Sequence, residues 1–267
     1  MSKNIKIAWT LGGELRNSKT AFNLLRFYKE YFKKSNIDLH FYGCFWKSSY
    51  ADFCIENGYL DVFNDYVIEE VPKNGVVNGQ KKYVKHNITG RSISLYNWSY
   101  GCYRSNYIRK LNQLQTKDEY RVVFFSRPDI YVPFYRLKKL PAEIQDLYLP
   151  RVRAVDYTMY IPPLRKALGD SLEYHYHCDD TKVVGDQRAM DVFSTNFHLI
   201  YINNSSSYVG SYHNIPAITC KRYDLEVRSD SELSKKWMIL RKDDGIKVEF
   251  NVNIEKEYRE WLKTINK

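Results

Sequence analysis

The residues best suited to chemistry stand where a short apolar run ends. In the segment Arg121–Val132, consecutive Val and Phe residues stop at Ser126-Arg127-Pro128-Asp129. Such runs are typical of strands buried on both faces of a parallel sheet, and open α/β sheets bind ligands where their strands end. Asp129 could ligate Mg²⁺ or Mn²⁺, and Arg127 could neutralise a diphosphate. The alternative is an Arg–Asp pair on the surface.

A second group, Thr10-Leu11-Gly12-Gly13-Glu14-Leu15-Arg16, follows the first expected strand. Glycines at that place let the backbone approach a ligand, and the next helix offers N–H groups to an anion. Arg16 could supply a planar fork for a phosphate. The pattern is neither Gly-x-Gly-x-x-Gly nor a P-loop, so it favours neither a dinucleotide site nor a P-loop site. The alternative is a tight turn whose glycines only permit positive φ.

A third group lies further along the chain. His175-Tyr-His177-Cys178-Asp179-Asp180 carries metal-binding side chains, but no distant set of ligands completes a site. Asp186 stands just before a helical pattern, where it suits an N-cap. A helix N-terminus would also keep this carboxylate ionised, as a general base requires. No Gly-x-Ser-x-Gly motif is present, so a serine hydrolase is not supported.

These residues need a framework of strands and helices. A strand at residues 5–11, a helix with apolar positions from Ala21 to Phe32 and a strand at 38–43 indicate a right-handed parallel crossover. A parallel sheet would place the glycine turn and the Arg127–Asp129 pair at the same edge. The long segment at 72–91 reads as a loop, either a lid or a simple excursion. The other expected elements are an amphipathic segment at 51–60, strands at 65–71, 121–126, 147–149 and 199–202, and helices at 92–115, 186–197 and 253–265.

Composition limits the class of protein. The 267 residues suffice for one large α/β domain, and 44% hydrophobic with 16% aromatic residues argues against disorder. No apolar stretch is long enough to span a membrane and no signal peptide is evident, so we expect a soluble intracellular protein. The five cysteines form no Cys-x-x-Cys pair, which favours reduced thiols over a zinc site. The net charge of +10 is spread along the chain, so it suits a phosphate-bearing ligand or an anionic membrane better than a dedicated nucleic-acid site.

The order of these motifs resembles small bacterial and viral GT-A-type glycosyltransferases over roughly residues 5–205. Members of that family commonly carry Asp-x-Asp where this chain has Arg127-Pro128-Asp129, so only the last aspartate matches. The resemblance implies a single GT-A-like (Rossmann-like) α/β domain with a mostly parallel central sheet flanked by helices. Residues 1–132 would bind a nucleotide-sugar and residues 133–267 an acceptor. The residue roles that it implies are donor binding by Thr10, Leu11, Gly12, Gly13, Arg16, Asn97, Arg104, Arg127 and Asp129, a divalent cation (Mn²⁺ or Mg²⁺) on Asp129, acceptor binding by Gln187, and a general base at Asp186.

The implied activity is transfer of a sugar from a UDP-sugar to a hydroxyl of a glycan acceptor with inversion, by a hexosyl- or pentosyltransferase. The missing first carboxylate leaves metal dependence open. The expected location is the cytoplasm of a bacterial cell or a virus-infected host cell, either free or peripherally attached to a membrane, and no nucleic-acid partner is expected. The alternative is a catalytically inactive module that binds a glycan or nucleotide, and a basic RNA-binding protein comes third. The donor sugar, the acceptor, the choice between inversion and retention, and the oligomeric state stay open.

Overall fold

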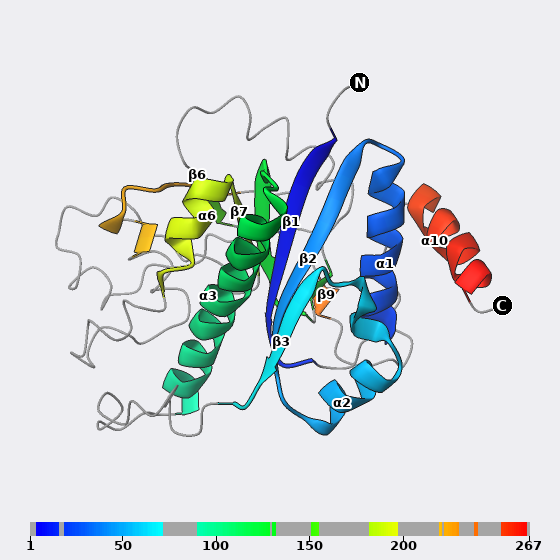
Figure 1. Ribbon diagram of the computed structural model, residues 1–267, viewed down its shortest axis with the longest axis horizontal. Coiled ribbons are helices and arrows are strands. Elements are labelled where there is room, and N and C mark those ends of the chain that lie inside the picture. Colours follow the sequence, from blue (N-terminus) through cyan, green and yellow to red (C-terminus); the bar gives the residue numbers. More distant parts are fainter. Residues whose placement is uncertain are drawn as a thin grey trace.

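A computed structural model describes residues 4–15, 19–71, 90–128, 130–131, 151–154, 182–196, 219–220, 222–229, 238–239 and 252–265. Its strands and helices alternate through the first half of the chain (Figure 1). No helix within these ranges is long and apolar enough to cross a membrane. The elements are β1 (Ile5–Gly13), α1 (Lys19–Lys33), β2 (Ile37–Trp46), α2 (Ser49–Glu56), η1 (Tyr59–Val62), β3 (Asp65–Glu69), α3 (Gly90–Thr116), β4 (Val122–Ser126), β5 (Ile130–Tyr131), β6 (Arg151–Ala154), β7 (Lys182–Gly185), α6 (Gln187–Phe193), β8 (Glu226–Ser229), β9 (Met238–Ile239) and α10 (Val252–Ile265).

The main sheet has the strand order β3-β2-β1-β4-β7-β6-β8. The first four of these strands are parallel, β7 runs antiparallel to both of its neighbours, and β6 pairs with β8 in parallel. The chain moves outward from β1 to β3 and then returns through α3 to β4, on the other side of β1. The predicted class, an α/β protein with a mostly parallel central sheet flanked by helices, is confirmed.

Both faces of the sheet are buried, which explains the uninterrupted apolar runs in its central strands. Trp9 of β1 and Phe124 of β4 face one core, and Ala8 and Phe125 face the other. This alternation is the period of two that any strand imposes on its side chains. Helices α1, α2 and α10 cover the first face, and α3 and α6 cover the second (Figure 1).

Most of the predicted elements within the described residues are present, with shifted ends. β2 runs on to Trp46, and the long helix spans Gly90–Thr116. The amphipathic segment at 51–60 is two elements, because Gly58 adopts a left-handed φ of 64° and separates α2 from η1. The predicted terminal helix is α10, and Trp261 Nε1 in it donates a hydrogen bond to Glu30 Oε2 of α1 at 2.7 Å. The expected strands at 147–149 and 199–202, the His175–Asp180 group and the loop up to residue 89 lie outside the described residues.

Candidate functional site

The first two predicted groups meet at the carboxyl edge, the edge of the sheet at which β1, β2, β3 and β4 end. Leu11 of β1 pairs with Ser126 of β4 in parallel register, so Gly12 and Gly13 run beside the residues that follow β4. A Cβ atom on Gly13 would lie 3.8 Å from Pro128 Cδ. The chain reverses its direction of travel across the sheet between β1 and β4, and ligands of open α/β sheets bind at such switch points.

The two glycines serve different purposes. A Cβ on Gly12 would lie only 2.5 Å from the backbone carbon of Gly101, so Gly12 lets α3 cross β1 in backbone contact. Gly13 has a φ of 128°, which side-chain-bearing residues rarely adopt, and Pro128 alone of the described residues would lie within 4 Å of its Cβ. The expectation that both glycines admit a ligand therefore needs correction. Gly12 lets α3 approach β1, and Gly13 is not crowded by any described residue at the edge.

Thr10 and Leu11, which were predicted to border the nucleotide, have buried side chains. Thr10 Oγ1 donates a hydrogen bond to the Phe124 carbonyl oxygen at 3.2 Å, and Trp9 Nε1 donates to Ser126 Oγ at 2.8 Å. These bonds hold β1 against β4. The structure thus assigns the side chains of Thr10 and Leu11 to the sheet rather than to a ligand, because neither is exposed at the edge.

Asn97 of α3 stands near the same edge. It lies one helical turn before Gly101, on the side of α3 that approaches β1. Its Oδ1 atom is buried and has no hydrogen-bond partner in the described part of the chain. A buried acceptor without a partner costs about 1–3 kcal/mol, and such exceptions call for an explanation. A ligand that donates an N–H or O–H hydrogen bond to Asn97 Oδ1 at this edge would explain the unpaired acceptor.

Arg104 is the other residue of α3 that was predicted to bind the nucleotide-sugar donor, and its side chain pairs with Glu69 instead. Its Nε donates to Glu69 Oε1 at 2.8 Å, and its guanidinium carbon lies 5.5 Å from the centre of the Tyr107 ring. Tyr100 OH donates to the other Glu69 oxygen at 2.6 Å. Burial lowers the pKa of Arg104 and the Glu69 carboxylate raises it, with a net rise. Because Glu69 balances its charge, Arg104 is a weaker phosphate ligand than its type alone suggests.

Three predicted residues of this edge remain, and the structure describes one of them. Arg127 is half-buried directly after β4, whereas Arg16 and Asp129 lie outside the described residues. Within the described ranges, no three His, Cys, Asp or Glu side chains are close enough to share a metal ion.

Asp186 and Gln187 do not join this edge. β7 is antiparallel to β4, with Gly185 opposite Val123 and Lys182 opposite Ser126. The end of β7 therefore lies at the amino edge, where β1 and β4 begin. Val123, which lies opposite Gly185, is three residues from Ser126 at the carboxyl edge, and this corresponds to roughly 10 Å at the rise of a strand.

The side chains of Asp186 and Gln187 have structural partners. Asp186 Oδ1 accepts a hydrogen bond from the Ala189 N–H at 2.8 Å, as an N-cap of α6 does. Gln187 Oε1 accepts from the Tyr120 N–H at 3.1 Å and from Gln113 Nε2 at 3.2 Å. The structure therefore does not bring Asp186 and Gln187, predicted as base and acceptor contact, to the carboxyl edge where the predicted donor-binding groups meet. The reason is the direction of β7, which reverses the end at which the following helix begins.

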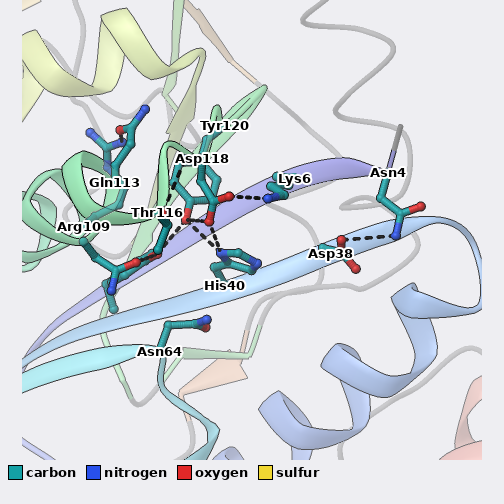
Figure 2. A network of polar contacts seen from close by, with 12 residues as sticks. Asn4, Lys6, Asp38, His40, Asn64, Arg109, Gln113, Thr116, Asp118 and Tyr120 are labelled. Carbon is teal, nitrogen blue, oxygen red and sulfur yellow. Dashed lines mark hydrogen bonds and ion pairs between the residues drawn. The ribbon is translucent and has the colours of Figure 1, made fainter. Parts of the chain in front are cut away.

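The amino edge carries a polar cluster that the sequence did not reveal (Figure 2). His40 Nδ1 lies 2.8 Å from Tyr120 OH, which lies 2.6 Å from Tyr42 OH. Tyr42 OH in turn donates to Asn112 Oδ1 at 3.0 Å, and Lys6 forms an ion pair with Asp118. We call this set the amino-edge network; its members are Lys6, His40, Tyr42, Asn112, Asp118 and Tyr120. No local pattern in the sequence singles them out, because they come from β1, β2, α3 and the segment before β4.

Burial and neighbouring charges set the protonation states of the amino-edge network. Burial lowers the pKa of His40, although Asp118 lies 3.4 Å from its Nδ1. Burial acts to raise the pKa of Asp118, but the Lys6 ammonium outweighs it and the pKa is lowered. Burial and the contact with Tyr42 raise the pKa of Tyr120. At neutral pH the network therefore holds a neutral histidine, an ionised aspartate and two protonated tyrosines, which satisfy one another.

A buried ion pair joins α3 to α6 beside this network. Arg109 is fully buried and pairs with Asp191, while its Nε donates to Asn106 Oδ1 at 2.8 Å. Its Nη1 donates to Gln113 Oε1 at 2.7 Å. Burial lowers the pKa of Arg109, and Asp191 opposes this. The guanidinium is held by protein groups on several sides, which is the environment that a structural arginine requires.

No family model matches the chain, and no curated protein matches it. The solved structures to which it is similar include glycosyltransferases. Mouse xyloside xylosyltransferase 1 aligns at 8% identity and a TM-score of 0.40, covering 85% of this chain and 84% of that one. The galactosyltransferase LgtC aligns at 10% and 0.41, covering 84% and 73%. A glycosyltransferase involved in glycosylation of the major capsid of PBCV-1 aligns at 10% and 0.35, covering 97% and 99%.

Proposed function

We propose that this protein is a glycosyltransferase that moves a sugar from a nucleotide-sugar, a UDP-sugar in the first instance, to a hydroxyl group of a glycan acceptor. The observation that carries the proposal is the meeting of Gly13 and Pro128 at the carboxyl edge, where β1 and β4 end side by side. It joins two motifs more than a hundred residues apart at a switch point of the sheet. Arg127 stands beside that contact, and its charge suits a diphosphate.

In this proposal the donor diphosphate lies along the carboxyl edge. The open backbone at Gly13 lets the phosphates approach, and Arg127 neutralises the charge that develops on the departing diphosphate. Arg16 and Asp129 follow Gly13 and Pro128 closely in sequence and are proposed to complete the phosphate site. Asp129 would hold a divalent cation, Mn²⁺ or Mg²⁺, which would supply further positive charge to the diphosphate.

Asn97 is the proposed contact for the nucleotide portion of the donor. Its buried Oδ1 accepts hydrogen bonds and can pair with a ring N–H group, which a uracil base carries. A pairing of this kind would relieve the cost of the unpartnered acceptor. By this argument residues 1–132 form the donor half of the protein, and the acceptor binds to groups contributed by residues 133–267.

The acceptor hydroxyl must lose a proton during transfer. Asp186 is not assigned to that step, because its carboxylate caps α6 at the amino edge. Direct displacement of the diphosphate by the acceptor hydroxyl would invert the anomeric centre. Comparison of the anomeric configuration in donor and product by NMR tests that outcome.

The experiment that tests the proposal combines calorimetry with a donor-hydrolysis assay. We expect saturable binding of UDP by the wild type and about tenfold weaker binding by Arg127→Gln, because a charge-assisted hydrogen bond contributes about 1.5–3 kcal/mol. Arg121→Gln is the matched control, since Arg121 precedes β4 at the amino edge. Absence of UDP binding by the wild type contradicts the donor site. Binding without hydrolysis or transfer of any UDP-sugar favours a binding module, which the replacement of the first carboxylate by Arg127 would suit.

A further inference from the structure

The outer surface of α3 carries large apolar side chains in a row. Tyr107, Leu111 and Leu114 are 38%, 42% and 66% exposed. Their spacing of four and three residues places them on one face of the helix. We call these three residues the outer row of α3. Tyr103 extends the row by one turn, with its ring stacked on that of Tyr107 at 6.1 Å between centres.

The exposure of the outer row does not come from loose packing of the helix. On the opposite side of α3, Trp98, Cys102, Ser105 and Ile108 are buried against the sheet and α6. Helix α3 therefore already has a complete buried face. The outer row adds a second apolar face that points away from the sheet. Contiguous exposed apolar surface of this kind marks an interaction site more often than isolated residues do.

Charge indicates what kind of partner fits the outer row. From Gly90 to Lys117 the chain contains no Asp or Glu. Arg104 and Arg109 are paired with acidic residues of other elements, whereas Lys110 and Lys117 are exposed and flank the two leucines. The surface is therefore apolar and basic. A two-fold pairing of α3 with a second copy would bring like charges together, which disfavours self-association and favours an anionic partner.

We propose that the outer row of α3 binds the surface of an anionic lipid bilayer. Leu111 and Leu114 enter the boundary between headgroups and acyl chains, and Tyr107 lies at headgroup level. Lys110 and Lys117 contact anionic headgroups, which attract basic side chains near the surface. Leucines favour a bilayer over nucleic acid, whose backbone offers them no apolar partner. The inference rests on this helix alone and does not depend on the proposed transferase activity.

Helix α2 provides an internal control. It exposes Phe53 and Ile55 to a similar degree, but these residues are two apart and point in different directions. Exposed Asp52 and Glu56 flank them. The α2 surface is thus apolar without being basic or forming a row. It is not expected to approach an anionic bilayer.

The test is flotation of the full chain with vesicles of phosphatidylcholine mixed with phosphatidylglycerol, beside vesicles of phosphatidylcholine alone. We expect binding to the anionic vesicles and a loss of about tenfold or more in the partition coefficient for Leu111→Ser/Leu114→Ser, since serine removes the apolar surface that each leucine would bury in the bilayer. For Lys110→Gln/Lys117→Gln we expect a loss of about tenfold or more, because each lysine is attracted to the anionic headgroups, and the remaining binding should depend less on salt. Phe53→Ser/Ile55→Ser should bind as the wild type does.

The outcomes separate the proposal from its competitors. No binding by the wild type, or equal binding to both vesicle types, overturns it. So does an unchanged partition coefficient in both α3 double variants, or a loss in the α2 variant as large as theirs. A dimer in solution that Leu111→Ser/Leu114→Ser dissociates, without vesicle binding, overturns it in favour of self-association. Circular dichroism checks that each variant is folded, and if the leucine variant unfolds, the lysine variant still decides, because both lysines lie outside the core.

Discussion

At the amino edge of the sheet, His40, Tyr42 and Tyr120 satisfy one another at 2.6–2.8 Å, and Lys6 neutralises Asp118. At the carboxyl edge, among the described residues, only Pro128 lies within 4 Å of the Gly13 Cβ position, and the Asn97 Oδ1 atom is buried without a hydrogen-bond partner. The comparison separates two kinds of polar site. Polar groups that hydrogen-bond to one another stabilise the fold, and polar groups without a partner in the protein are the better candidates for binding.

The same comparison applies to the titratable residues that sequence alone favoured. Asp186 has the charge of a catalytic base, yet its carboxylate accepts the hydrogen bond that begins α6. Arg104 has the charge of a phosphate ligand, yet Glu69 holds it. The type of a residue therefore predicts its function poorly when another residue of the fold already pairs with its charged group. Four sets of variants, from the largest expected effect to the smallest, test whether the two edges differ in this way.

The largest effect is expected at the buried ion pair beside the amino edge. Arg109→Ala should lower the free energy of unfolding by about 3–5 kcal/mol, because it leaves Asp191 partly buried without its cation. Chemical denaturation measures the change. Lys263→Ala, which breaks the exposed pair with Glu260, is the control and should change it by less than about 1 kcal/mol. Similar losses in the two variants would contradict the structural role of Arg109.

The two glycines of the carboxyl edge should respond differently. Gly12→Ala places a methyl group against the Gly101 backbone and should lower the free energy of unfolding by about 1–3 kcal/mol or more. Gly13→Ala has room for its methyl group but strains the backbone, so it should lower that free energy by about 1–2 kcal/mol and also weaken UDP binding. Denaturation and calorimetry on both variants measure the two quantities. A Gly12→Ala protein as stable as the wild type would show that α3 does not approach β1 so closely.

Asp186 allows its cap role to be separated from catalysis. Asn caps helices about as well as Asp, so Asp186→Asn should keep the free energy of unfolding within a few tenths of a kcal/mol, whereas Asp186→Ala should lose about 1 kcal/mol. Sugar transfer should persist in Asp186→Asn, because its side chain lies at the edge opposite the donor. Loss of transfer in a fully stable Asp186→Asn protein would restore this residue as the base.

The smallest effect concerns pH. Burial lowers the pKa of His40 in the folded protein below its value of about 6.5 in the unfolded chain. Between those two values the unfolded chain binds more protons, so stability is lost as the pH falls below about 6.5. Asp118, whose folded pKa is also lowered, contributes stability that is lost only as the pH falls through that lowered value. Chemical denaturation across this range should give a free energy of unfolding that rises with pH, with a slope that His40→Gln reduces. An unchanged slope in this variant would contradict the burial of a neutral histidine.

The sequence predicted the framework of the carboxyl edge because its evidence is local. The strand pattern of Ile5–Leu11, the helical spacing up to Phe32 and the apolar run that ends at Ser126 each depend on neighbouring residues. A strand–helix–strand unit then favours parallel pairing, which brings the ends of β1 and β4 together. The class of fold and the meeting of Gly13 with the Arg127 segment follow from these patterns.

The tertiary structure decided what no local pattern contains. Val183-Val184-Gly185 is an apolar strand whether it runs with β4 or against it, and its antiparallel direction carries Asp186 to the amino edge. Position 12 requires glycine because the Gly101 backbone of α3 lies against it. The amino-edge network joins Lys6, His40 and Tyr120, which are far apart in the chain. Periodicity in sequence reports which face of an element is buried. Only the packed chain determines which element lies against that face, and hence which polar groups have a hydrogen-bond partner within the protein and which do not.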